Sequence, residues 1–138
     1  MIAVDTNVLA RFYIEDEADA ESKRQRALAR SVLGSDRRFF VALSVIQELE
    51  WVMRGAYGFS SKDAADVLDH LLGLPNIDVD AAAAVRTAND WHRQGMDFSD
   101  ALHLALSGSC SELATFDRSF AKHSRRLGLK PSPSILTA

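Results

Sequence analysis

The first residues of the chain place a carboxylate directly after a short apolar segment. Residues 2–4 are apolar, and Asp5, Thr6 and Asn7 follow them at once. The apolar run predicts a buried β-strand, and the residues after it predict a helix. Ligands of open α/β sheets bind outside the carboxyl ends of the strands. Asp5 is therefore either the N-cap of the following helix or part of a site at this edge.

Apolar segments of strand length alternate with helical patterns along the rest of the chain. We expect strands over 39–43, 77–79 and 112–115 and a marginal one over 134–136. We expect helices over 6–14, 20–33, 44–56, 60–72, 81–94, 97–107 and 117–127, with Ser44 as the N-cap of the third. This alternation predicts an α/β fold with a parallel sheet, whose right-handed crossovers bring the strand ends to one edge.

The composition is that of one globular domain. The chain has 138 residues, of which 47% are hydrophobic and 25% charged, and without repeats or linkers we expect a single domain over 1–138. Its only cysteine is Cys110, which excludes an intrachain disulfide and favours a reducing compartment. A charge at Asp5 precedes any apolar signal region, and no apolar stretch is long enough to span a bilayer. We therefore expect a cytoplasmic protein that does not enter a membrane.

The formal net charge of −3 disfavours a protein that coats nucleic acid without sequence preference. It is compatible with an enzyme whose acidic pocket has a local basic rim. Two basic clusters are candidates for such a rim, although solvated helix faces also explain them. They are Lys23, Arg24, Arg26, Arg30, Arg37 and Arg38 in the first half and Lys122, His123, Arg125, Arg126 and Lys130 in the second.

Two acids lie on the helix expected after the second strand, and their neighbours differ. Residues three and four positions apart share a helix face. Glu50 meets Arg54, so an exposed ion pair explains it. Glu48 meets Trp51 and Val52 and has no cation within helical reach. A carboxylate among apolar groups needs a partner or a bound cation, so Glu48 is either a site residue or a residue at the flank of the helix.

Three further acids lie at helix starts in the second half of the chain. Asp97 has the position of an N-cap, and Asp100 lies in the first turn, where the helix dipole favours an anion. Asp117 follows Thr115 at the end of a strand and begins the next helix, which repeats the design at Asp5. Helix-start chemistry explains each of these acids when it is taken alone.

The acids gain a second interpretation when they are considered together. Several carboxylates without nearby cations repel one another, and hard divalent cations such as Mg²⁺ or Mn²⁺ relieve that repulsion. The chain has no histidine cluster and no pair of cysteines, so the sequence gives little support to a zinc site. An oxygen-only metal site suits phosphoryl chemistry, because the metal activates water and neutralises charge on the phosphate.

Four segments of the chain resemble the PIN-domain ribonucleases, and especially the VapC-type toxins of bacterial toxin–antitoxin pairs. They are residues 4–9, 45–52, 97–105 and 113–118, in the order and spacing of that family. The resemblance implies a compact three-layer α/β/α sandwich around a mainly parallel sheet of four or five strands. It also implies cleavage of RNA that depends on Mg²⁺ or Mn²⁺, by in-line attack of a metal-activated water on a phosphodiester.

The resemblance further implies roles for individual residues and partners. The metal-binding, catalytic acids would be Asp5, Glu48, Asp100 and Asp117, and the supporting residues would be Asp97, Thr6, Asn7 and Thr115. Family members often have another acid at the position of Ser119, and its absence leaves open whether Asp117 is a ligand or supports one. Family toxins are usually homodimers and are silenced by a small cognate antitoxin that lies across the active-site groove.

Other classes of protein fit the sequence less well. A haloacid-dehalogenase-type phosphatase needs a second Asp where this chain has Asn7, and a receiver domain needs an acid beside Asp5 and a late lysine. No glycine-rich phosphate loop is present, which argues against a nucleoside-triphosphate enzyme. A PIN-like RNA-processing nuclease outside a toxin system and a non-catalytic RNA- or protein-binding module stay open. Acids at all four motif positions argue against the non-catalytic module.

Overall fold

A computed structural model describes residues 1–16 and 19–138 of the chain. The chain divides into two compact units, a first unit of Met1–Ala82 and a second unit of Ala83–Ala138. Each unit contains its own parallel strands together with the helices that connect them. This repetition of parallel strands and helices confirms the predicted α/β class.

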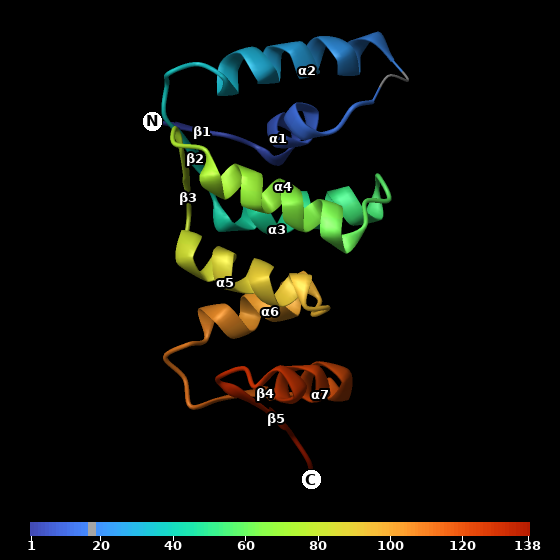
Figure 1. Cartoon of the computed structure of the whole chain (residues 1–138), viewed down its shortest axis with the longest axis vertical. Helices are drawn as coiled ribbons and strands as arrows, with labels where there is room; N and C mark the ends of the chain where they lie inside the picture. Colours follow the sequence, from blue (N-terminus) through green and yellow to red (C-terminus); the bar gives the residue numbers. More distant parts are fainter. Residues whose placement is uncertain (17–18) are drawn as a thin grey trace. The chain divides into compact units, whose positions relative to one another are not determined.

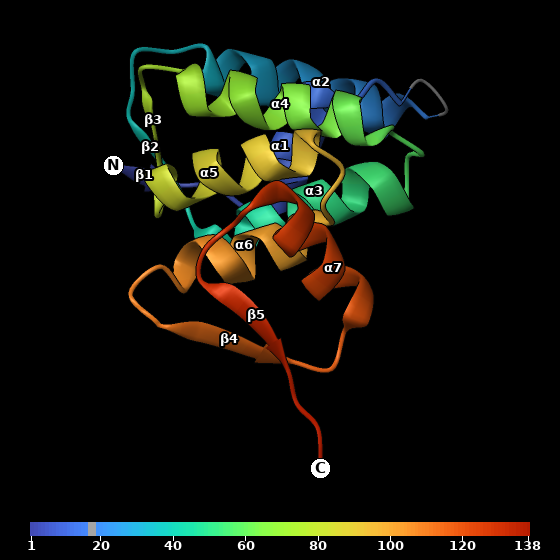
Figure 2. The same ribbon diagram turned by 60° about the horizontal axis from the view of Figure 1, so that its bottom comes forward.

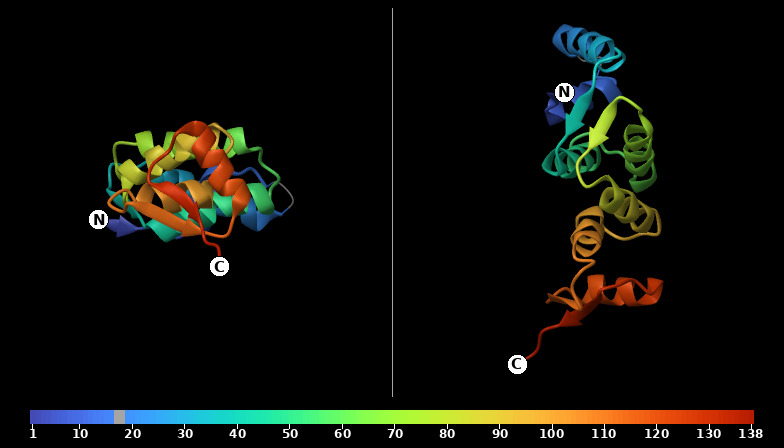
Figure 3. Two further views of the ribbon diagram at one scale, coloured as in Figure 1. Left: turned by 90° about the horizontal axis from the view of Figure 1, so that it is seen from below. Right: turned by 90° about the vertical axis from the view of Figure 1, so that its left-hand side faces the viewer.

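The first unit is built on a three-stranded parallel sheet. Its strands are β1 (Ile2–Ala3), β2 (Phe39–Val41) and β3 (Ile77–Val79), in the order β1-β2-β3 (Figure 1 and Figure 3, right). Ile2 pairs with Phe39, and Phe39 pairs with Ile77. All three strands therefore end at the same edge of the sheet, and Asp5 follows the end of β1 there.

Two helices fill each crossover of the first unit. The helices are α1 (Thr6–Tyr13) and α2 (Ala20–Leu33) between β1 and β2, and α3 (Leu43–Gly55) and α4 (Ser61–Gly73) between β2 and β3. Helix α1 packs against both α2 and α3, and α3 packs against α4. The most deeply buried large side chains of this unit are Leu9, Phe39, Val41, Ile46, Leu49, Met53, Leu68 and Leu71. This apolar core fixes α1 and α3, the two elements that carry the acids of the first unit.

The second unit consists of three helices and a two-stranded parallel sheet (Figure 2). Its elements are α5 (Ala82–Arg93), which begins at the unit boundary, α6 (Phe98–Leu106), β4 (Glu112–Thr115), α7 (Arg118–Leu127) and β5 (Ser132–Ile135). Helix α7 crosses between the two strands, packs against β5 and ends at Gly128, whose φ of +69° suits glycine. Asp117 lies between the end of β4 and the start of α7.

Three details differ from the sequence-based expectation. The five strands form separate sheets of three and two strands, whereas four or five strands were expected in one sheet. Helix α3 begins at Leu43 with Ala42 as its N-cap and no capping side chain, so the prediction that Ser44 is the N-cap is wrong. The last strand begins earlier than expected, at Ser132. Among the described residues, no helix combines the length and the hydropathy needed to cross a membrane.

Candidate functional site

Asp5 is the N-cap of α1. Its Oδ1 accepts a hydrogen bond from the backbone N–H of Thr6 at 2.7 Å, and the side chain is exposed. The cap bond uses one carboxylate oxygen, so the second oxygen can still receive another ligand. The two sequence-based explanations of Asp5, a cap and a site residue, are therefore compatible with each other.

Asp5 and Glu48 line the same small pocket of the first unit. This pocket, which we call the acid pocket, has a volume of about 300 Å³. Its lining consists of Asp5, Thr6, Asn7, Ala10, Arg11, Glu48, Val52 and Tyr57. Residues from the start of α1 and from the middle of α3 thus bring two predicted metal ligands to one cavity.

Thr6 contributes a buried hydroxyl to the acid pocket. Its side chain is only 5% exposed, and Oγ1 has no hydrogen-bond partner among the described residues. A buried hydroxyl without a partner costs free energy, so such a group is retained where a ligand or a positioned water can complete it. Asn7 is exposed on the same lining. Carboxylate, hydroxyl and amide oxygens together fit the donors that a hard divalent cation prefers.

The environments of the two acids on α3 differ from those expected. Glu48 is exposed and faces the acid pocket, so the expectation that it is wedged among apolar groups is wrong. Glu50 is 1% exposed, so the expected exposed ion pair is a buried one. Its partner is Arg54, whose Nε donates to Oε1 and whose Nη2 donates to Oε2 at 3.1 Å. Glu50 shares its helix face with the buried Ile46 and Met53, which draws it inward.

Arg11 is a residue of the acid pocket that sequence reasoning missed. Its Nε donates to Gln25 Oε1 at 2.9 Å, and its Nη1 donates to Tyr57 Oη at 3.3 Å. These bonds hold the positive charge of Arg11 at the pocket that Glu48 also lines. Helix α3 itself has no cation within reach of Glu48, so this cation comes from α1. The available signal was the position of Arg11 four residues after Asn7, which places both on one face of α1.

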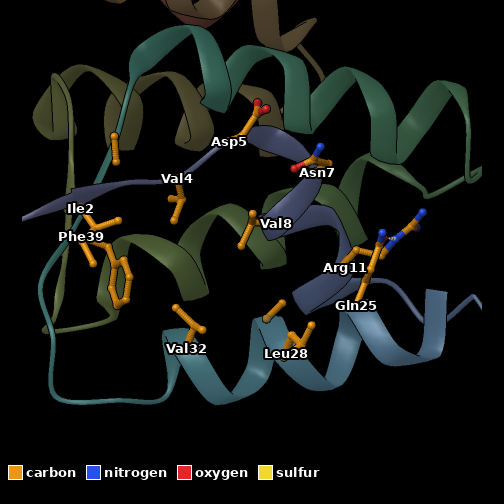
Figure 4. Close-up of a pocket in the computed structure, with 12 residues that line it drawn as sticks. Ile2, Val4, Asp5, Asn7, Val8, Arg11, Gln25, Leu28, Val32 and Phe39 are labelled. Atoms are coloured by element: carbon orange, nitrogen blue, oxygen red, sulfur yellow. Dashed lines mark hydrogen bonds between the residues drawn. The ribbon is translucent and has the colours of Figure 1, made fainter. Parts of the chain in front are cut away.

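An apolar groove adjoins Asp5 on the side of α2. It has a volume of about 550 Å³ and is lined by β1, α1, α2 and Phe39. Figure 4 shows Val8, Leu28 and Val32 around this groove, with the Asp5 carboxylate pointing away from Leu28 and Val32. Leu28 and Val32 are exposed although they are apolar. The groove and the acid pocket share Asp5, Asn7 and Arg11.

The second unit gathers the other predicted acids at two helix starts. Asp97 caps α6 by accepting a hydrogen bond from the backbone N–H of Asp100 at 3.1 Å. Asp117 caps α7 by accepting from the N–H of Phe120 at 2.9 Å, and Thr115 Oγ1 accepts from the N–H of Asp117 at 3.0 Å. All of the cap roles considered for Asp97 and Asp117 are therefore present in the structure.

Asp100 lies in the electrostatic field of the other two acids. Burial raises the pKa of its half-buried carboxyl group, and the negative charges of Asp97 and Asp117 raise it further. His103, one turn further along α6, acts in the opposite direction. The carboxylates of Asp97 and Asp117 are thus close enough to Asp100 to disfavour its ionised form.

The predicted ligands form two groups, one in each unit. Asp5 and Glu48 belong to the first unit, and Asp100 and Asp117, with Asp97, belong to the second. Within residues 1–16 and 19–138, no three histidine, cysteine or acidic side chains are already placed as a metal-binding cluster. The donor chemistry of each group fits a hard divalent cation, and each group supplies fewer protein ligands than such a cation can accept.

The comparison with protein families matches the chain to one model. This model, described as PIN domain, covers residues 2–126 and so spans both units and every candidate acid. A search among curated proteins finds no match. A match over nearly the whole chain fits an α/β sandwich. The chain belongs to the PIN-domain family.

Proposed function

We propose that the protein is a ribonuclease that depends on Mg²⁺ or Mn²⁺ and hydrolyses phosphodiesters of RNA. Family membership supports a nuclease and a hydrolase in general terms. The observation that carries the proposal is the acid pocket, where Asp5 and Glu48 meet beside the unpartnered Thr6 hydroxyl. This pocket provides oxygen donors to a cation without supplying a side chain that would bind a soft metal.

The residues that would hold the metal are Asp5 and Glu48 in the first unit and Asp100 and Asp117 in the second. Asp97 and Thr115 would support the second pair, because they bond to the backbone N–H groups of Asp100 and Asp117. When bound, the metal supplies an activated water and offsets negative charge on the phosphate.

The chain's own residues have distinct tasks in this proposal. Asp5 is fixed by its cap bond, which leaves its second carboxylate oxygen for the ligand. Thr6 and Asn7 add a hydroxyl and an amide group to the lining of the acid pocket. Arg11, held by Gln25 and Tyr57, offers its positive charge to a phosphate oxygen near the acids. These roles create a place in which a phosphodiester is bound and oriented for in-line attack.

The finer part of the proposal is a toxin of a toxin–antitoxin pair. The four motif segments support it, and so does the apolar groove, because exposed Leu28 and Val32 are typical of a protein-binding surface. In this proposal a small antitoxin covers the groove and the adjoining Asp5. The proposed toxin acts in the cytoplasm and is a homodimer. Light scattering of the purified protein should therefore give twice the mass of one chain, which is 15.2 kDa.

The test of the proposed activity uses purified protein freed from any antitoxin. We expect it to cleave structured RNA with Mg²⁺ or Mn²⁺ and to stop when EDTA is added. D5N should be inactive, whereas D36N, which changes an exposed acid outside the acid pocket, should cleave like the wild type. Absence of metal-dependent cleavage in the wild-type protein would overturn the proposal.

A further inference from the structure

The first unit contains a second polar hollow, whose lining does not include Asp5 or Glu48. This hollow has a volume of about 600 Å³, and its polar lining residues are Tyr13, Arg26, Arg30, Asp66 and His70. We call it the arginine hollow. Arg26 and Arg30 also line an adjoining hollow of about 360 Å³. It shares no residue with the acid pocket.

Arg26 has an unused donor beside the arginine hollow. Its side chain is 18% exposed, and Nη2 forms an ion pair with Glu15 Oε1 at 3.3 Å. Nη1 is buried and has no hydrogen-bond partner among the described residues. A guanidinium group offers five N–H donors, and an unsatisfied buried donor of a charged group is costly. The ion pair with Glu15 therefore satisfies the guanidinium group of Arg26, which lines the hollow, only in part.

Arg30 adds a second guanidinium to the same side of α2. It lies four residues after Arg26, so the two side chains share a helix face, and it is exposed. The single acid of the lining, Asp66, accepts a hydrogen bond from Lys62 Nζ at 2.9 Å. The charge of Asp66 is thus shared with Lys62, and that of Arg26 with Glu15, so the net positive charge of the arginine hollow is due to Arg30.

Tyr13 and His70 supply a neutral donor to the hollow. Tyr13 Oη lies 2.8 Å from His70 Nδ1, and the two rings form an edge-to-face pair with centroids 5.5 Å apart. Burial raises the pKa of Tyr13, so its phenol stays protonated. When Oη donates the hydrogen bond to Nδ1, the imidazole carries its own proton at Nε2 and offers an N–H group from which an anion can accept a hydrogen bond.

We propose that the arginine hollow binds a backbone phosphate of the RNA strand, away from the bond that is cleaved. Arginine forks match phosphate oxygens in geometry and charge, and here two of them stand beside a histidine donor. Tyr13 ends the helix that Asp5 caps, so the two residues are separated by about 12 Å along α1. A short stretch of one RNA strand spans that separation. This inference rests on the proposed function, because its ligand is the substrate.

The test measures binding of a labelled single-stranded RNA of mixed sequence to the full chain in EDTA, where no cleavage occurs. R30A should weaken binding equally for different sequences, and it should lower the slope of log affinity against log salt by about 0.7, the value for one phosphate contact. R26A and R26K should both weaken binding, the latter because lysine lacks the fork. R24A is the matched control, since Arg24 is an exposed residue of α2 paired with Glu21 and lines neither hollow.

The outcomes separate this inference from the proposed function. Unchanged affinity and salt slope in R30A would overturn the arginine hollow as an RNA site, and cleavage by that variant would leave the nuclease proposal intact. Weakened binding in R30A with no metal-dependent cleavage by the wild type would support the hollow and overturn the nuclease. The melting temperature with and without inorganic phosphate gives a further outcome. If R30A binds RNA normally but loses a rise in melting temperature that phosphate causes in the wild type, the inference is overturned, because the hollow then binds a small anion and not RNA.

Discussion

Glu48 and Glu50 lie two positions apart on α3 but face different environments. Glu48 is exposed on the acid pocket with Asp5, whereas Glu50 is 1% exposed and bonded to Arg54. The first carboxylate is available to a ligand, and the second is engaged in holding the helix in place. Substitution of each should therefore change a different property of the protein.

We expect E48Q to lose activity and E50Q to lose stability. E48Q should reduce RNA cleavage by at least the 10- to 100-fold typical of residues that support a metal ligand. Its melting temperature without metal should match that of the wild type, because Glu48 is exposed. E50Q should lower the free energy of unfolding by roughly 1–3 kcal/mol, since it leaves the half-buried Arg54 without its carboxylate. Equal activities of the two variants, measured well below both melting temperatures, would contradict these assignments.

T6V should lower the RNA-cleaving activity without lowering the stability of the metal-free protein. Valine has nearly the shape of threonine but removes the buried Oγ1 that has no partner among the described residues. We expect the metal-free variant to be as stable as the wild type or more stable, because an unsatisfied polar group is removed. Its metal-dependent cleavage should fall about 10- to 100-fold. T6S, which keeps the hydroxyl, is the control, and full activity in T6V would show that Oγ1 serves no ligand.

D100N should stabilise the metal-free protein at neutral pH. Because the pKa of Asp100 is raised in the folded state, its ionised form is less favourable there than in the unfolded chain. This penalty is fully present above the raised pKa and is lost as the pH falls toward the ordinary value of 3.8. Urea unfolding in EDTA should therefore show D100N to be more stable than the wild type at pH 7, with a smaller difference near pH 4. A less stable D100N at pH 7 would contradict the repulsion among these acids.

Local sequence patterns predicted the helices, the strands and the acidic caps, but they placed the cap of α3 wrongly at Ser44. Short apolar runs and breaker residues predicted each strand and helix, and Asp5, Asp97 and Asp117 cap helices as their positions indicated. The face of α3 that is buried depends on packing against other elements, which is why the neighbours of Glu50 along the helix did not predict its burial. Arg11 is held at the acid pocket by hydrogen bonds to Gln25 and Tyr57, and both residues are distant from it in sequence. The division of five strands between two sheets likewise depends on long-range pairing.

The central claim of the proposed function is that Asp5 and Asp100 are both needed for binding of the metal. Asn is as good an N-cap as Asp, so D5N should keep its fold. D100N should keep its fold because it removes no cap, since the N-cap of α6 is Asp97. The response of both variants to metal therefore tests the site rather than the stability of α1 or α6. D36N again serves as the matched control.

The most direct measurement is the melting temperature of wild type, D5N, D100N and D36N with and without Mn²⁺. A ligand at 100 times its dissociation constant stabilises the folded state by about 2.7 kcal/mol, which corresponds to a rise of roughly 8 to 10 °C for a chain of this length. We expect this rise in the wild type and in D36N and its loss in both D5N and D100N. A full rise in either D5N or D100N would contradict the proposed role of that residue in binding the metal.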